Sequence, residues 1–125
     1  MPNGWGGIDL GVPTVTPAHI TLPGTATIDV PLRAHGGNEA LLEFRIPPDS
    51  GIAFAQGAAE SQTRIRTVVP IQSDLPLHVK QTVHLESIGG PPTRVFIPID
   101  VSGRLMKDGE PVGREALVRV MLRIR

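Results

Sequence analysis

Proline and glycine recur along the whole chain, and they constrain its fold more than any other feature. The 125 residues include 13 prolines and 14 glycines, which leave few windows long enough for three helical turns. An interior proline removes a helical hydrogen bond and an interior glycine lowers helix stability, so helices are disfavoured. Residues 58–69 contain neither, yet Ile65, Val68 and Val69 within them favour a pleated strand. The sequence therefore predicts an all-β fold.

Apolar and polar residues alternate in short runs, and turn residues separate these runs. Such alternation places one side of a run against a core and the other side in solvent. The pattern predicts an antiparallel β-sandwich of seven to eight strands. The expected strands cover residues 18–22, 25–33, 40–46, 52–55, 64–71, 77–87, 94–101 and 115–125. The residues expected to be buried between two sheets are Ile28, Val30, Leu42, Phe44, Val83, Leu85, Ile97, Ile99, Val118 and Val120.

Three prolines, Pro31, Pro70 and Pro98, lie inside the expected strands. Proline has no backbone N–H to donate to a neighbouring strand, so we expect these positions to mark sheet edges or bulges. Residues 107–110 contain an Asp-Gly pair. Because both residue types tolerate positive φ angles, this segment is expected to form a tight hairpin turn.

The length of the chain is typical of one domain. We expect an N-terminal arm at residues 1–11, followed by a single β-sandwich domain at residues 12–125. The sequence contains no cysteine, which excludes disulfides, cysteine-ligated zinc, blue-copper centres and thiol nucleophiles. A domain of this size buries enough surface to fold without such crosslinks.

Charge and hydropathy limit the partners and the location. The 12 basic and 12 acidic residues cancel, which argues against binding to the phosphate backbone of nucleic acid. No stretch approaches the roughly 20 apolar residues of a membrane span, and residues 1–7 lack the pattern of a signal peptide. We therefore expect no nucleic acid and no membrane as partner. The initial Met favours a cytoplasmic product, although a domain within a larger secreted protein would share these features.

The histidines are candidate catalytic or metal-binding residues, because imidazole can act as acid, base or ligand. The four are His19, His35, His78 and His84. They are dispersed along the chain. His78 and His84 share the outward side of one expected strand, but six residues of strand separate them by about 20 Å. They cannot bind one metal ion together, and we interpret each as a surface or turn residue.

Serine and carboxylate patterns also lack a recognisable site. No Gly-x-Ser-x-Gly motif is present. Glu43 with Asp49, and Asp108 with Glu110, are candidate acid–base or calcium pairs, and Asp74 lies in an expected turn. These acids do not form the dense clusters that calcium cages use. We therefore predict no enzyme activity, no cofactor and no metal ion.

The last expected strand and the N-terminal arm carry a candidate contact surface. Leu117 and Met121 are expected to point outward among arginines, a composition typical of protein interfaces. The alternative is a solvated strand face with single exposed apolar residues. Trp5, flanked by glycines, is a candidate anchor for a partner's pocket, or folds back over one end of its own domain. The candidate interface residues are Trp5, Leu117, Arg119, Met121, Arg123 and Arg125.

Two segments carry a family resemblance. Residues 15–30 contain Val-Thr-Pro and then Leu-Pro-Gly-Thr-Ala-Thr-Ile-Asp-Val, and residues 93–101 read Thr-Arg-Val-Phe-Ile-Pro-Ile-Asp-Val. The chain resembles bacterial and bacteriophage immunoglobulin-like domains, in which Thr-Pro and Pro-Gly precede a Thr-rich second strand and late strands alternate Val and Ile. The resemblance covers residues 12–101. The chain departs from antibody-type domains because it lacks the cysteine pair and has no tyrosine.

Together these features predict a non-enzymatic structural or interaction protein. We expect a component of a larger assembly, such as a decoration or accessory protein of a phage particle, in a virion or a cytoplasmic assembly. Its expected partners are proteins, either further copies of the chain or a larger particle. The alternative is an immunoglobulin-like adhesion or carbohydrate-contacting module of a bacterial surface protein, at the cell surface. One Trp, three Phe and no Tyr provide few rings for stacking on sugars.

Overall fold

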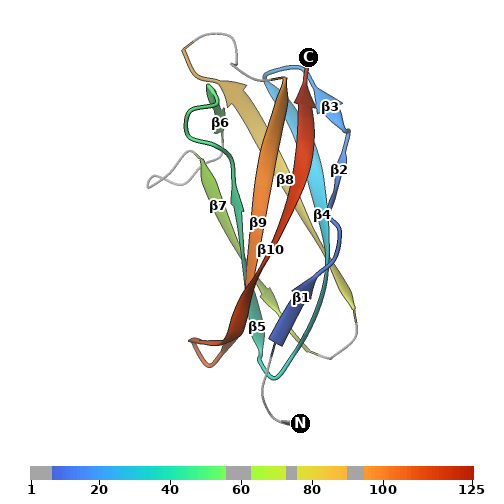
Figure 1. The fold of residues 1–125 in the computed structure, drawn as a ribbon, viewed down its shortest axis with the longest axis vertical. Coiled ribbons are helices and arrows are strands. Elements are labelled where there is room, and N and C mark those ends of the chain that lie inside the picture. The colour runs from blue at the N-terminus through green and yellow to red at the C-terminus, as the bar shows by residue number, and fades with distance from the viewer. Residues whose placement is uncertain (1–6, 56–62, 73–75, 90–94) are drawn as a thin grey trace.

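The strands of this protein form two curled sheets that face each other along the long axis of the molecule (Figure 1). The computed structural model describes residues 7–55, 63–72, 76–89 and 95–125. The regular secondary structure within these ranges consists of strands alone, which confirms the all-β prediction. The strand pairs are mostly antiparallel, as the alternating pattern predicted.

The first sheet contains four strands from the first half of the chain and one long strand from the second half. Its strands lie in the order β1-β4-β8-β6, and β2 pairs with β4 beside β1. All of its pairs are antiparallel. The strands are β1 (Gly7–Leu10), β2 (Thr14–Thr16), β4 (Gly24–His35), β6 (Ile52–Phe54) and β8 (Leu77–Ser87).

The second sheet contains the C-terminal hairpin at its centre. Its strands lie in the order β3-β10-β9-β5-β7. The short β3 runs parallel to β10, and the other pairs are antiparallel. The strands are β3 (His19–Ile20), β5 (Glu39–Arg45), β7 (Arg64–Pro70), β9 (Phe96–Lys107) and β10 (Glu110–Ile124).

The N-terminal segment is divided between the two sheets. β1 and β2 pair with β4, and β3 then pairs with the end of β10. Residues 7–10, which the sequence placed in the arm at 1–11, therefore form a strand of the first sheet. The alternation in this stretch is only four residues long, which is why the pattern did not reveal it. Residues 1–6 lie outside the described part of the chain.

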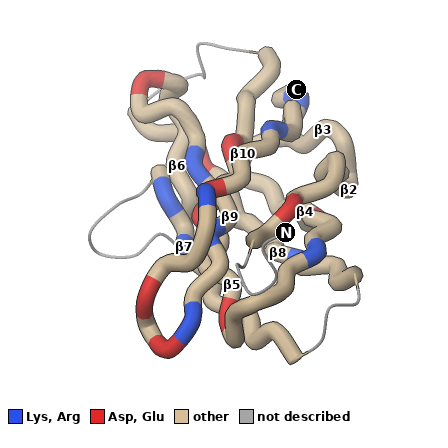
Figure 2. The backbone as a smooth tube through the Cα atoms, turned by 60° about the horizontal axis from the view of Figure 1, so that its bottom comes forward, with Lys and Arg blue, Asp and Glu red and all other residues tan. Residues whose placement is uncertain are grey.

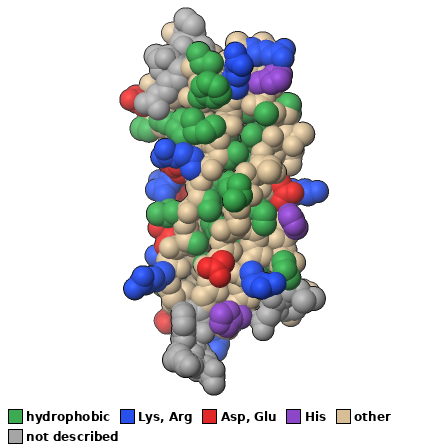
Figure 3. Space-filling model, turned by 45° about the vertical axis from the view of Figure 1, so that its right-hand side comes forward, with side chains coloured by type: hydrophobic (Ala, Val, Ile, Leu, Met, Phe, Trp, Pro, Cys, Tyr) green, Lys and Arg blue, Asp and Glu red, His purple; other side chains and the backbone are tan. Residues whose placement is uncertain are grey.

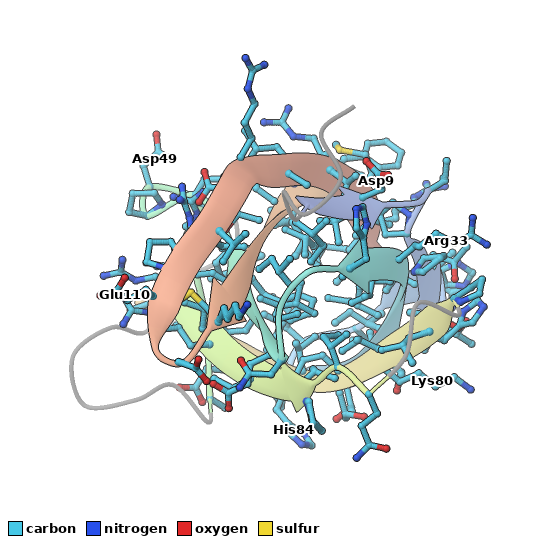
Figure 4. The ribbon with its side chains drawn as sticks, turned by 90° about the horizontal axis from the view of Figure 1, so that it is seen from below. Asp9, Arg33, Asp49, Lys80, His84 and Glu110 are labelled. Atoms are coloured by element: carbon cyan, nitrogen blue, oxygen red, sulfur yellow. The ribbon has the colours of Figure 1, made fainter. Side chains whose placement is uncertain are left out.

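Side chains from both sheets fill the space between them, as the end-on view shows, whereas Asp49, Lys80 and His84 point outward (Figure 4). Nine of the ten residues predicted for the core are buried, including Phe44 at 0% exposure. The tenth, Val118, is only partly buried. β10 pairs with β3 only at Arg123 and Ile124. Among the described strands, none of the second sheet therefore pairs with the outer edge of β10 at Val118. Burial of apolar surface is the main stabilising contribution in such a core.

Two of the three strand prolines do not mark edge strands, which corrects the prediction. Pro70 ends the edge strand β7 as expected, but Pro31 lies in β4 and Pro98 in β9, both between neighbours. Gly11 N donates to Pro31 O at 2.7 Å, so the nitrogen of Pro31 faces the break between β1 and β2. Backbone groups of successive residues in β9 point alternately toward β10 and β5, and the nitrogen of Pro98 points toward β5. The pairing of β5 with β9 stops at Asp100 and does not reach Pro98. Each missing donor thus faces the end of a strand.

The hairpin predicted at residues 107–110 is present between β9 and β10. Asp108 and Gly109 have φ angles of 52° and 85°, and Lys107 pairs with Glu110. The side chain of Asn38 braces this turn, since its Nδ2 donates to Asp108 Oδ1 at 3.3 Å and its Oδ1 accepts from Asp108 N at 3.2 Å. The turn between β4 and β5 is therefore fastened to the tip of the C-terminal hairpin.

We predict that Phe44→Ala lowers the free energy of unfolding by about 3–5 kcal/mol, because truncation of a fully buried ring leaves a cavity. Chemical denaturation monitored by far-UV circular dichroism measures this change. Val68→Ala, at a 56% exposed position, is the control and should stay within about 0.5 kcal/mol of the parent. An unchanged denaturation midpoint for Phe44→Ala would show that the inward register of β5 is wrong.

We also predict that Gly37→Ala destabilises the protein by about 1–3 kcal/mol through overpacking. A Cβ atom at Gly37 would lie 2.6 Å from Leu105 Cγ and 2.7 Å from Met106 O, so the β4–β5 turn must move away from β9. The same denaturation assay measures the loss. Parent-like stability in this variant would contradict the close approach of the β4–β5 turn to β9.

Candidate interaction surface

The outward side of β10 presents the apolar residues that the sequence singled out. Leu117 is 65% exposed and Met121 is 47% exposed. Val120 and Leu122, which alternate with them, are buried in the core. The predicted orientation of Leu117 and Met121 is thus confirmed, and both lie on the outer face of the second sheet.

Phe96, on the neighbouring strand β9, adds an aromatic ring to this surface. It is 52% exposed and pairs in register with Arg123 of β10. The Cζ atom of Arg123 lies 5.9 Å from the centre of the ring, within the range of a cation–π contact. We call Phe96, Leu117 and Met121 the apolar stripe. In a space-filling view toward β10 and β2, hydrophobic side chains reach the surface between Lys and Arg side chains (Figure 3).

Arg119 lies between the two apolar residues of β10 and is held by a carboxylate. It pairs in register with Asp100 of β9. Its Nε donates to Asp100 Oδ1 at 2.6 Å and its Nη2 donates to Oδ2 at 3.3 Å, a two-point contact that fixes the plane of the guanidinium. The hydrogen bond and the charge of Asp100 raise the pKa of Arg119 above its ordinary value. The side chain therefore presents a fixed, permanent positive charge.

Three further arginines surround Glu43 on β5 and β7. Arg66 Nε donates to Glu43 Oε2 at 3.0 Å. Arg45 Nε lies 3.5 Å from Oε1, and Arg64 Nη1 lies 3.8 Å from Oε2. The sequence had paired Glu43 with Asp49 as a candidate carboxylate pair, whereas the contacts in the structure neutralise Glu43 with arginines. We call Arg45, Arg64, Arg66 and Arg119 the arginine belt.

Two shallow depressions share Arg45, Asp100 and Arg119, and the belt meets the stripe in one of them. One, of about 400 Å³, extends to Leu117. The other, of about 460 Å³, extends to Pro98 and the prolines that follow β5. Both are open to solvent, so they suit side chains of a docked surface better than an enclosed small molecule.

Of the remaining predicted interface residues, one lies beside β3, two residues beyond Arg123, and the other lies outside the described ranges. Arg125 follows the end of β10, where its N donates to Ile20 O at 2.9 Å and its guanidinium contacts the ring of His19. It therefore lies at the β3 end of the sheet. Trp5 belongs to residues 1–6, and Asp74, the turn acid considered for calcium, belongs to residues 73–75, neither of which is described.

The outer face of the first sheet is polar, and its side chains bind one another. His78 Nδ1 lies 2.8 Å from Asp29 Oδ1, and His84 Nδ1 lies 2.9 Å from the hydroxyl of Thr25. The two histidines have different partners, as expected from their separation along β8. Within the described ranges, no three His, Asp or Glu side chains converge as a metal site.

Two comparisons with known proteins found no match. The chain matches no protein-family model, and no curated protein is significantly similar to it. In the residues that the structure describes, there is no helix with the length and hydropathy needed to cross a membrane.

We predict that Asp100→Asn releases the guanidinium of Arg119 while the fold remains intact. The Nε–H of Arg119 should exchange with solvent faster in this variant, because its charged acceptor is lost. NMR exchange measurements on arginine Nε–H groups test this. The Nε–H of Arg66, which is bonded to Glu43, is the internal control and should not change. Equal exchange of Arg119 in the parent and the variant would contradict the Arg119–Asp100 contact.

Proposed function

We propose that this protein is a non-enzymatic structural or interaction protein that binds other proteins through the outer face of its second sheet. The observation that carries the proposal is the apolar stripe, in which three large apolar side chains are about half or more exposed on two adjacent strands. Arg119 and Arg123 lie among them, each held by a neighbour. Buried aromatic, methionine and arginine side chains are enriched in protein interfaces, where a few anchors supply most of the binding energy.

We infer further that the fold is an immunoglobulin-like β-sandwich. β4, β8 and β6 are adjacent in one sheet and β10, β9 and β5 in the other, an arrangement similar to the two sheets of immunoglobulin domains. β1, β2 and β3 run in one direction along the same side and pair successively with β4 and β10. If these three count as one interrupted strand, the ten strands become eight, within the number expected from the sequence.

The specific role we propose is that of a component of a larger assembly, such as a decoration or accessory protein of a phage particle. The resemblance to bacteriophage immunoglobulin-like domains supports this role, and so does a preformed strand surface that requires little ordering on binding. The location consistent with it is a virion or a cytoplasmic assembly.

The second candidate is an adhesion or carbohydrate-contacting module at a bacterial cell surface. The observation that favours it is the exposed ring of Phe96, since sugars stack on aromatic rings. Arg123 already lies over this ring, so a sugar stacked on that face would have to displace it. We therefore favour a protein partner.

The double variant Leu117→Ser/Met121→Ser tests the proposal. We expect the parent to self-associate at high concentration or to co-sediment with assembled particles, and the variant to lose this association because its apolar anchors are removed. Analytical ultracentrifugation measures the association, and far-UV circular dichroism verifies that the β-structure is retained. Ile88→Ser, which changes a 49% exposed residue beyond the end of β8, is the matched control.

The control variant should associate as the parent does. A parent that stays monomeric at every concentration and sediments with no particle would overturn the proposal. Equal association of the double variant and the parent would instead place the interface on another face.

A further inference from the structure

We propose that the arginine belt receives an acidic, extended segment of a protein partner, which presents carboxylate and apolar side chains on the same side. This inference rests on the proposed function and adds the chemistry of the partner. The carboxylates would meet the belt, and the apolar side chains would meet the apolar stripe on the same face.

The first argument is an uneven distribution of charge. The whole chain is neutral, with 12 basic and 12 acidic residues. The outer face of its second sheet carries six arginines and four carboxylates at outward positions, an excess of two positive charges. Basic positions lie close together on the strands around β7 and β9 (Figure 2). The residues are Arg45, Arg64, Arg66, Arg104, Arg119 and Arg123, against Glu39, Glu43, Asp100 and Glu115.

The second argument is the hydrogen-bonding capacity that the belt retains. Glu43 is the shared counter-ion of three guanidinium groups, and its side chain is only 16% exposed. Arg66 makes a hydrogen bond of 3.0 Å with it, but the contacts of Arg45 and Arg64 are 3.5 and 3.8 Å long. A guanidinium has five N–H donors, so one carboxylate cannot satisfy three of these groups. An incoming carboxylate can accept from Arg45 and Arg64 without displacing Glu43 from Arg66.

The third argument is spacing. The strand register aligns Arg119, Asp100, Arg45 and Arg64 in one row across β10, β9, β5 and β7. Neighbouring strands are about 4.8 Å apart, and alternate residues of one extended strand are about 6.7 Å apart. Arg66 lies two residues beyond Arg64 on β7 and points the same way. An extended segment that runs along β7 with carboxylates two residues apart can therefore reach Arg64 and Arg66, and Arg45 lies one strand away from Arg64.

The belt suits discrete carboxylates better than a nucleic-acid backbone. Asp100 and Glu43 lie within it and would repel a continuous line of phosphates. Leu117 borders the belt and favours an apolar side chain from the ligand. A partner with separate acidic and apolar groups can satisfy both features, whereas a polyphosphate chain satisfies neither.

The probe for this inference is a fluorescent six-residue peptide with glutamate at positions 1 and 3, leucine at position 5 and serine at the other positions, so that glutamate and leucine share one side of the extended chain. Fluorescence anisotropy at low ionic strength compares it with the same peptide carrying glutamine in place of glutamate, and with a single-stranded oligonucleotide. We expect the glutamate peptide to bind most tightly. Its affinity should fall as ionic strength is raised to about 0.15 M, because exposed charges more than about 8 Å apart are then largely screened from one another.

Protein variants then locate the site. Arg45→Gln/Arg64→Gln should weaken binding of the glutamate peptide about five- to tenfold, the effect expected for two exposed charges. Asp100→Asn should strengthen binding, because it removes a negative charge from the belt. Lys80→Gln, on the outer face of the first sheet, is the matched control and should bind as the parent does.

Several results would overturn the inference: equal affinity for the glutamate and glutamine peptides, equal losses in Lys80→Gln and Arg45→Gln/Arg64→Gln, or tighter binding of the oligonucleotide. Its failure is distinguishable from failure of the proposed function. If Leu117→Ser/Met121→Ser still abolishes association of the full chain while the peptide does not bind, the interface stands and only the acidic partner is wrong.

Discussion

Burial of alternating side chains between the two sheets is the constraint on which the rest of the structure depends. Phe44 and Leu42 on β5 and Ile28 and Val30 on β4 belong to the one core cluster, and these residues are fully buried. Because strand side chains alternate, the same burial fixes which residues point outward, and a shift of one residue would reverse both faces. The positions of Leu117 and Arg119 on the surface therefore follow from the core beneath them.

Much of the fold could be predicted from this alternation, and the failures have local causes. β8 has the predicted bounds, and β4 and β5 differ from prediction by one or two residues at their ends. β9 and β10 extend well into residues 102–114, which the sequence left outside strands. The pairing there shifts register between Val112 and Ala116, and Gly113 has a φ of 73°. A bulge interrupts the period of two, so no alternation marks the strand across it.

The interaction surface was predictable along one strand and unpredictable across several. The outward side of β10 follows from its own sequence, and so does the outward position of Phe96 on β9. The contacts of Glu43 with Arg64 and Arg66 depend on the pairing of β5 with β7. Glu43 is about twenty positions away from these two arginines in the chain. Strand order and register are properties of the whole fold, and local sequence does not contain them. The belt therefore emerges only when the sheet is assembled.

The contrast between the two outer faces explains why the second sheet is the candidate surface. On the first sheet, Asp29 binds His78 and Thr25 binds His84, so polar groups of similar capacity are matched in pairs. On the second sheet, the guanidinium groups outnumber the carboxylates, and the side chains of Phe96, Leu117 and Met121 are exposed on the same face. A matched polar face gains little by exchanging its partners for those of another protein, since hydrogen bonds lost and gained nearly cancel. A face with exposed apolar area gains from its burial, the excess of positive charge favours an acidic partner, and the strand ladder holds these groups in place before a partner arrives.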